Sequence, residues 1–220
     1  GPTLEGLLAN GRLPLDLADS LALGILAGVG AAHRVGFLHR DLKPGNVLLQ
    51  PTDAALVPKV ADFGLTKLLD PGEGAMSRTR TGAAMGTPAY MAPEQIRNPK
   101  GTDRRADIFA LGAVFYEMYC GEPAFPGEDM LDVFNAIAQG RFVPLRERVP
   151  EVPERVAAAI EAALRVDRDE RPPDCEALTA LWTGAPPVAG RGSAMRASLP
   201  DAREAGGRPS NPTLAPAMLR

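Results

Sequence analysis

The sequence predicts a mainly α fold, a helical bundle that carries one short pair of β-strands. Apolar residues recur every three or four positions over 16–35, 103–120 and 153–166, which is the period of helices with a buried face. Two short apolar runs, 47–49 and 57–60, flank a turn, as the strands of a hairpin do. The chain has 220 residues, enough for one domain of ordinary size.

The first ten residues predict a short amphipathic helix. Thr3 is a suitable N-cap, Glu5 in the first turn complements the helix dipole, and Gly11 is a stop signal.

The helix expected over 16–35 is interrupted by three glycines. They are spaced Gly-x-x-x-Gly-x-Gly inside a helical pattern, whereas a phosphate-binding G-x-G-x-x-G loop follows a strand. This spacing favours close packing of the helix over nucleotide binding. His33, near the end of the helix, is expected to be structural.

The rest of the chain predicts one loop and four more helices. Residues 69–85 are rich in Gly, Ser, Thr and Arg with little apolar periodicity, which is typical of a mobile, regulatory loop. The helix over 103–120 is apolar on most sides, so we expect it at the centre of the domain. Further helices are expected over 129–139, 153–166 and 174–181.

The composition changes after Thr183. Pro, Gly, Ala and Arg dominate from there to Arg220. This predicts a folded domain over 1–183 and a disordered tail over 184–220. The tail carries five Arg against Asp201 and Glu204, hence +3, so a basic juxtamembrane segment and a plain solvated linker both remain open.

Composition also excludes some functions. A net charge of −3 and few aromatic residues argue against nucleic-acid binding. Cys120 and Cys175 form no Cys-x-x-Cys or Cys/His cluster, which fits a reduced cytoplasmic interior, and both are expected to be buried.

The apolar run 21–32 is shorter than a membrane span. Because the chain begins with Gly1 rather than Met, we expect a fragment or a processed product.

The octet 39–46 reads H-R-D-L-K-P-G-N and supplies a carboxylate, a cation and an amide within six residues. Phosphoryl transfer needs such groups to position reactants and neutralise negative charge. These groups are Asp41, Lys43 and Asn46. Alone, the octet is also explained as a surface turn, since Asp, Pro, Gly and Asn are turn formers. Two partner motifs, D-F-G at 62–64 and G-T-P-A-Y-M-A-P-E at 86–94, favour the catalytic interpretation.

Together the three motifs resemble the catalytic loop, the metal-binding motif and the end of the activation segment of protein kinases. The resemblance covers residues 1 to about 182 and implies the larger, C-terminal lobe of that fold, with the strand pair carrying the catalytic and metal loops. It implies ATP and Mg²⁺ as cofactors, with Asn46 and Asp62 holding the metal and Lys43 near the transferred phosphoryl group. Asp41 would orient the substrate hydroxyl and accept its proton.

Further residues extend the resemblance to bacterial serine/threonine kinases. Lys43 with Pro44 is similar to the serine/threonine class, in which Thr87 would bridge Asp41 and Lys43. Arg40 resembles the arginine of kinases that are switched on by phosphorylation of the activation loop, because a guanidinium can bind phosphate bidentately.

The candidate phosphate acceptors are Thr79 and Thr81, and an ordinary solvated loop is the alternative. Glu94 and Arg171 resemble a buried ion pair, and Asp107 an acid that braces the catalytic loop from the central helix. These three would have structural roles.

The sequence contains no G-x-G-x-x-G loop, no V-A-I-K lysine and no helix glutamate to pair with such a lysine. In the kinase family these parts belong to the small N-terminal lobe, which covers ATP, so we expect this polypeptide to be inactive alone. The favoured hypothesis is a fragment of an active bacterial kinase that acts on Ser or Thr of protein substrates. The alternatives are a non-catalytic docking or dimerisation module and a small-molecule kinase of related fold. A kinase dimer for autophosphorylation, and a membrane anchor or sensor domain beyond Arg220, are also compatible with the resemblance.

Overall fold

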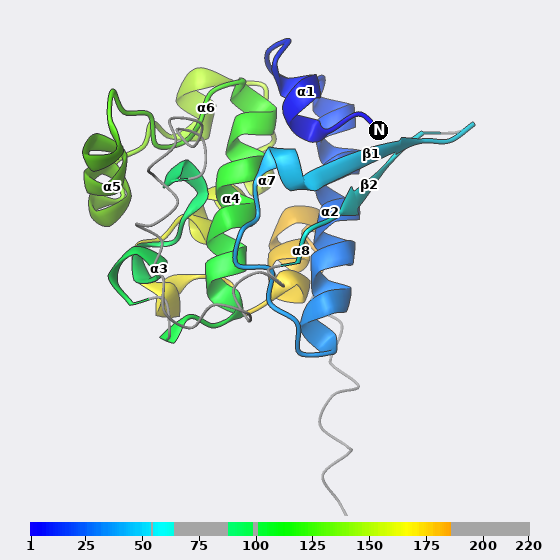
Figure 1. The fold of residues 1–220 in the computed structure, drawn as a ribbon. Helices are drawn as coiled ribbons and strands as arrows, with labels where there is room; N and C mark the ends of the chain where they lie inside the picture. Colours follow the sequence, from blue (N-terminus) through cyan, green and yellow to red (C-terminus); the bar gives the residue numbers. More distant parts are fainter. Residues whose placement is uncertain (54, 64–87, 99–100, 186–220) are drawn as a thin grey trace, which may run out of the picture. The chain divides into compact units, whose positions relative to one another are not determined.

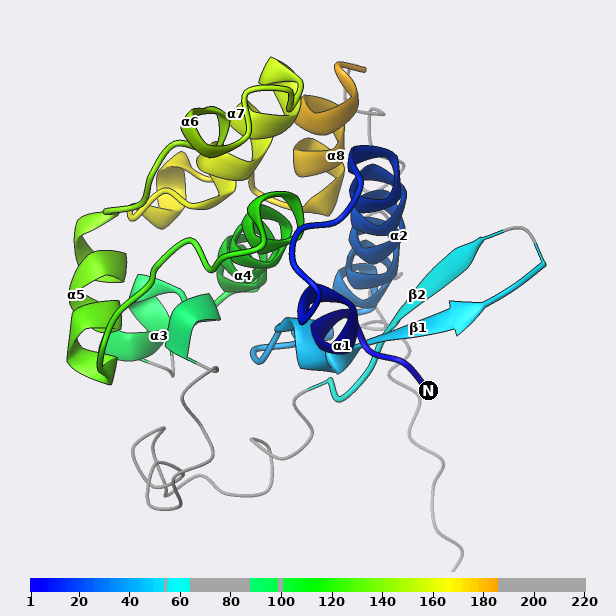
Figure 2. The same ribbon diagram turned by 90° about the horizontal axis from the view of Figure 1, so that it is seen from above.

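Helix α4 (Arg104–Cys120) is the centre of the structure, a computed structural model that describes residues 1–53, 55–63, 88–98 and 101–185. Asp103 caps the helix by accepting a hydrogen bond from the Arg105 amide, and Gly121 ends it with φ 81°. Thirteen of its seventeen residues are buried, which confirms the predicted central helix. Figure 2 shows α4 with other helices on several sides.

Helix α2 (Leu15–Arg34) packs on β2, α4 and α8. A Cβ at Gly24 would lie 2.6 Å from Pro58, and one at Gly30 would lie 3.2 Å from the Cβ of Cys175. The glycines therefore permit close packing, as expected. By length and composition alone α2 could cross a membrane, but the burial of Leu21, Ile25 and five of its other residues identifies it as a core helix here.

The single hairpin of the described residues joins β1 (Val47–Pro51) to β2 (Leu56–Val60), antiparallel with Val47 opposite Val60. It extends from the helical body beside α2 (Figure 1). Helix α1 (Leu4–Leu8) begins at the predicted cap, where the Thr3 hydroxyl accepts from the Gly6 amide. The expected mainly α fold with one strand pair is confirmed.

The remaining helices are α3 (Pro93–Arg97), α5 (Met130–Gln139), α6 (Leu145–Arg148), α7 (Glu154–Ala163) and α8 (Cys175–Thr183). Three match predictions, although α7 ends three residues earlier than predicted; beyond its end, the carbonyls of Arg165 and Val166 accept hydrogen bonds from the Arg171 side chain. Helices α3 and α6 were not predicted, since five and four residues are too few to show a period.

The two cysteines differ in burial. Cys175 is buried, as expected, whereas Cys120 is only partly buried. Cys120 is the last residue of α4, where the helix reaches the surface, and its thiol donates to the Glu122 carbonyl at 3.1 Å. The expectation of two buried cysteines was therefore wrong for Cys120.

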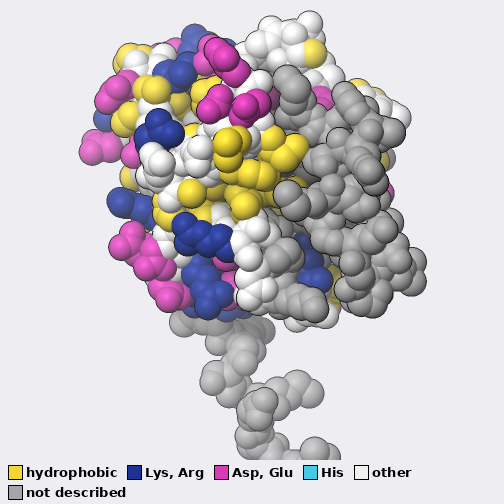
Figure 3. Space-filling model, turned by 60° about the vertical axis from the view of Figure 1, so that its left-hand side comes forward, with side chains coloured by type: hydrophobic (Ala, Val, Ile, Leu, Met, Phe, Trp, Pro, Cys, Tyr) yellow, Lys and Arg dark blue, Asp and Glu magenta, His cyan; other side chains and the backbone are white. Residues whose placement is uncertain are grey.

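Helix α5 lies at the periphery and leaves apolar surface exposed. Only Ala136 and Ile137 of this helix are buried, and Leu131 is 65% exposed. The face that comes forward in Figure 3 shows hydrophobic side chains gathered in one patch among charged ones. Such patches often bind other proteins.

Candidate active site

The octet 39–46 follows α2 and is hydrogen bonded to a side chain of α4. Asp107, near the start of α4, is 2% exposed. Its carboxylate accepts the backbone amide of His39 on Oδ2 and that of Arg40 on Oδ1, both at 2.8 Å. Arg40 has φ 64°, a conformation that non-glycine residues rarely adopt without such support. The loop is thus fixed by a buried charge.

His39 continues this support to the next residue. Its ring is fully buried and its Nε2 donates to the Ala61 carbonyl at 2.8 Å. With the proton on Nε2, Nδ1 is an acceptor, and it receives the Asp41 amide at 3.3 Å. Side chains therefore bind three successive backbone amides, which sets the position of Asp41.

The three predicted chemical groups of the loop meet in the structure. Lys43 places its Nζ 3.4 Å from Oδ2 of Asp41, and both side chains are 30% exposed. The Asn46 amide nitrogen donates to the Asp41 carbonyl at 2.7 Å. A partly exposed carboxylate thus lies beside a cation at the surface, where a substrate can reach it.

Asp62 lies close to Asn46 because the two chain segments are hydrogen bonded. The Ala61 amide donates to the Asn46 carbonyl at 2.9 Å where β2 ends. Asp62 follows with φ 58°, a second left-handed non-glycine residue. Among the described residues, strained backbone of this kind occurs only at Arg40 and Asp62, both within the candidate site.

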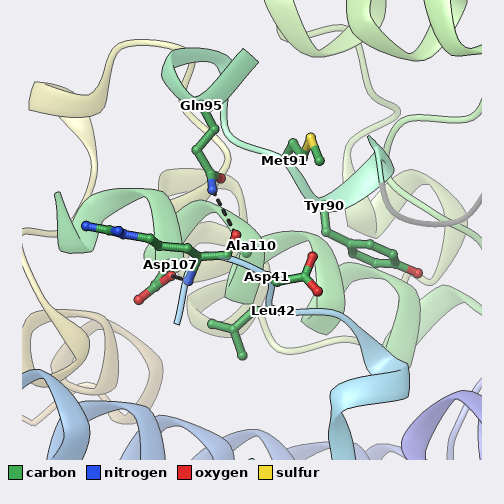
Figure 4. A pocket seen from close by; sticks show the side chains of 8 residues that line it. Asp41, Leu42, Tyr90, Met91, Gln95, Asp107 and Ala110 are labelled. Atoms are coloured by element: carbon green, nitrogen blue, oxygen red, sulfur yellow. Dashed lines mark hydrogen bonds between the residues drawn. The ribbon is translucent and has the colours of Figure 1, made fainter. Parts of the chain in front are cut away.

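The segment 88–97 closes another side of the loop. The Gln95 amide nitrogen donates to the Arg40 carbonyl at 3.0 Å (Figure 4), and the Gln95 amide oxygen accepts a hydrogen bond from the Ala92 amide. A cavity of about 10 Å³, room for about one water, lies between this segment, the loop and α4. Sequence reasoning missed Gln95, because an ordinary glutamine inside a short helix gives no signal.

Tyr90 joins the same segment to α4. Its hydroxyl donates to Glu117 at 2.6 Å. Burial, more than the charge of Glu117, raises the pKa of Tyr90 above its usual range, and burial also raises the pKa of Glu117. The hydroxyl therefore keeps its proton and holds the segment in place.

Glu94 and Arg171 form the expected ion pair. The guanidinium binds the carboxylate bidentately at 2.8 and 2.9 Å, and the Arg171 side chain is completely buried. Three further hydrogen bonds run to the carbonyls of Arg165, Arg105 and Val166. The pair anchors α3 to the late helices.

Three predicted site residues cannot be placed. Thr79, Thr81 and Thr87 lie outside the described residues, as does the predicted loop over 69–85. Their roles stay predictions. The tail, from 186 onward, also lies outside.

Comparisons with known proteins bear on this arrangement. A family model for the protein kinase domain matches residues 2–183. The DNA damage-responsive serine/threonine-protein kinase RqkA of Deinococcus radiodurans is 42% identical over 150 residues, and the match covers 68% of this chain. The tyrosine-protein kinase MasK of Myxococcus xanthus is 40% identical over 167 residues, which is 76% of this chain. The chain spans 21% and 25% of the length of these two relatives.

A solved structure agrees with the sequence matches. The crystal structure of Rad53 1–466 in complex with AMP-PNP aligns with a TM-score of 0.63 and 27% identity. The alignment covers 81% of this chain and 43% of that one. With its catalytic-loop geometry and a family match over most of its length, this chain belongs to the protein kinase family.

Proposed function

We propose that this chain supplies the catalytic and substrate-binding part of an ATP-dependent kinase that phosphorylates Ser or Thr of protein substrates. The observation that carries the proposal is the group formed by Asp41, Lys43 and Asn46 on one braced loop. The printed sequence holds no glycine-rich phosphate loop, so we propose that full activity needs residues outside it.

Each group of the loop has a chemical task. Asp41 accepts a hydrogen bond from the substrate hydroxyl and takes its proton as the phosphoryl group is transferred. Lys43, 3.4 Å from that carboxylate, neutralises charge on the transferred group. Positioning and charge neutralisation supply most of the rate in phosphoryl transfer, so a rigid loop suits this chemistry.

Asn46 and Asp62 fit a magnesium site. The amide nitrogen of Asn46 donates a hydrogen bond to the Asp41 carbonyl, so its amide oxygen is the atom that can bind a cation. Among the described residues no group of three or more His, Cys, Asp or Glu side chains could hold a metal. Mg²⁺ commonly takes one or two protein oxygens and completes its shell with water and phosphate. A Mg²⁺ ion held by these two residues would supply positive charge against the phosphates of ATP.

Leu48 is an apolar floor suited to the nucleotide base. It lies on β1 two residues after Asn46 and is 40% exposed, while its neighbours Val47 and Leu49 are buried. Strand alternation turns Leu48 to the opposite face of the hairpin. An exposed leucine next to the phosphate-binding groups can cover one face of adenine. Sequence reasoning missed this residue, because nothing in the run Val-Leu-Leu says which leucine is exposed.

The first prediction concerns this floor. Leu48→Asp in the complete protein encoded by the gene should raise the KM for ATP about tenfold to a hundredfold, since it removes the burial of one leucine. Leu131→Asp on α5 is the matched control and should leave the KM for ATP unchanged. Steady-state kinetics with varied ATP measures both. Equal KM values for the two variants would show that Leu48 does not contact the base.

The second prediction concerns the activation loop. In the complete, active protein we expect Thr79 or Thr81, or both, to be phosphorylated by the kinase itself. Phosphopeptide mapping should find these sites in the wild type and not in an Asp41→Asn protein purified in the same way. Finding both threonines unmodified in active enzyme would contradict the prediction.

The hydroxyl specificity needs a direct test, because MasK is named a tyrosine kinase. Lys43, Pro44 and Thr87 support Ser or Thr as the acceptor. The assay supplies labelled ATP to the complete protein and identifies the phosphoamino acid in protein substrates. Phosphotyrosine alone would overturn this part of the proposal.

The need for residues outside the printed sequence is tested by comparing rates of phosphorylation. Equal rates from the 220-residue chain and the complete protein would overturn it.

A protein-binding role without catalysis is the second candidate. The patch of exposed hydrophobic side chains in Figure 3 favours it, because such patches often bind other proteins. Binding of a protein substrate by an Asp41→Asn variant separates docking from catalysis. The unpaired cysteines support a reducing, cytoplasmic location, which we propose for either function.

A further inference from the structure

Every serine in the tail over 184–220 follows an arginine by two residues. The three triplets are Arg-Gly-Ser at 191–193, Arg-Ala-Ser at 196–198 and Arg-Pro-Ser at 208–210. The other serines of the chain, Ser20 and Ser77, have alanine at that position. Only five residues of the tail are arginines, so the same spacing at all three serines is rare by chance. The function proposed above gives this repeated pairing of a cation and a hydroxyl no role.

An exposed carboxylate lies beside the catalytic loop. Glu5 belongs to α1, which packs on the turn Pro44–Asn46 of that loop. A Cβ added to Gly45 would lie 3.2 Å from Oε2 of Glu5, so the carboxylate lies where a longer side chain at position 45 would extend. None of the ion pairs within the described residues uses Glu5. Its charge is therefore available to a cation of a substrate.

The position of Glu5 suits the spacing of the triplets. Gly45 precedes Asn46, whose amide nitrogen lies 3.4 Å from Oδ2 of Asp41, so Glu5 is a close neighbour of the catalytic group. Two residues of an extended chain span about 7 Å, and the long side chain of arginine adds further reach. A guanidinium also binds a carboxylate through two parallel hydrogen bonds. With the serine at Asp41, the arginine two residues earlier can reach Glu5.

The charges of the two parts of the chain are complementary. The net charge of −3 divides into +3 over 184–220 and −6 over 1–183. Opposite net charges favour the encounter of the tail with the folded part, whether in one molecule or between two copies.

We propose that the kinase phosphorylates the three serines of its own tail, and that Glu5 binds the arginine two residues before each of them. The acceptors are Ser193, Ser198 and Ser210. This modification rests on the proposed function and names its substrate class, which is serine two residues after arginine.

The transfer uses the groups of the candidate active site. The serine Oγ forms a bond to the γ-phosphorus of ATP while the bond from that phosphorus to the β,γ-bridging oxygen breaks. ADP leaves, and Asp41 takes the hydroxyl proton. Each phosphate adds a charge of about −1.5 to −2, so three of them reverse the sign of the tail's charge of +3.

The first test maps phosphorylated serines in the complete protein. The protein is dephosphorylated, freed of the phosphatase and incubated with ATP and Mg²⁺, and its tail peptides are analysed by mass spectrometry. Phosphate should appear on the three tail serines in the wild type and on none of them in Asp41→Asn. A wild type that phosphorylates another protein but leaves all three serines unmodified overturns the inference and leaves the proposed function standing. A wild type that phosphorylates no substrate overturns both.

The second test measures how the arginine and Glu5 contribute to recognition. Two synthetic peptides have the sequence of residues 194–202, one with Arg196 and one with Arg196→Ala. The complete wild-type protein should phosphorylate the first with a kcat/KM about tenfold to a hundredfold higher, because the second has lost a charge-assisted pair. In Glu5→Gln this ratio of the two kcat/KM values should fall to within about threefold of one.

Glu154→Gln is the matched control for Glu5→Gln. Glu154 begins α7, which packs on α4, α6 and α8, and its side chain is 88% exposed. The control makes the same chemical change and should leave the peptide ratio at its wild-type value. Because both peptides are compared on one protein, a general loss of stability cancels in the ratio. A wild-type ratio near one, or equal ratios in Glu5→Gln and Glu154→Gln, would overturn the role of Glu5.

Discussion

Replacing Asp41 with Asn should lower the kcat of the complete protein about 10²- to 10⁴-fold, which is the contribution expected of a general base. The substitution preserves size and removes the charge. The backbone contacts that fix the residue, from Asp41 to His39 and from Asn46 to Asp41, remain available. The loss should therefore appear in kcat, with little change in the KM for ATP. Steady-state phosphorylation of a protein substrate measures both constants.

The control for this prediction is Asp53→Asn. Asp53 is an exposed carboxylate in the β1–β2 turn, so its loss changes the net charge by the same amount without touching the loop. Thermal unfolding of the Asp41→Asn chain should match the wild type closely, because the carboxylate is partly exposed and its contact with Lys43 is a weak surface pair. An Asp41→Asn enzyme as active as Asp53→Asn would remove Asp41 from the mechanism.

Sequence periodicity predicted the long elements of this fold and failed at the short ones. α2 and α4 have 20 and 17 residues, enough turns for an apolar repeat and for caps such as Asp103 to be visible. α3 has five residues, and its position depends on Gln95 and Glu94, whose partners lie far away in the sequence. Long-range pairing of this kind leaves no periodic signal.

The candidate site shows the same division. The octet identified Asp41, Lys43 and Asn46, because phosphoryl transfer needs a carboxylate, a cation and an amide close together. The resemblance to the D-F-G motif of protein kinases added Asp62. The structure places the first three in contact and the fourth next to Asn46 through the Ala61 amide. The residues that surround and support these four were only partly predicted. Asp107 was expected, but neither the contact of His33 with it nor the exposure of Leu48 could be read from the chain, because both depend on how distant elements pack.

Arg171→Ala should destabilise the domain by about 3–5 kcal/mol, the cost of breaking a buried pair from one side. All five N–H donors of the guanidinium are satisfied, two by Glu94 and three by the carbonyls of Arg165, Arg105 and Val166. The charge also lies 5.0 Å from the centre of the Phe109 ring. Alanine would leave a carboxylate and three carbonyls without these donors and a cavity beside the ring. Urea unfolding of the 220-residue chain measures the loss.

Arg12→Ala separates the effect of burial from the effect of charge. Arg12 also forms an ion pair at 2.8 Å, with Glu151, but the two side chains are 52% and 49% exposed. Exposed pairs contribute about 0–1 kcal/mol because water screens them. Arg171→Lys adds a second comparison. Lysine has three N–H donors on a flexible side chain and cannot replace the five donors of the planar guanidinium, so most of the loss in unfolding free energy should remain. If Arg171→Ala lowers the free energy of unfolding no more than Arg12→Ala does, then burial of Arg171 and its three bonds to carbonyls do not stabilise the domain as predicted. In that case other contacts hold α3.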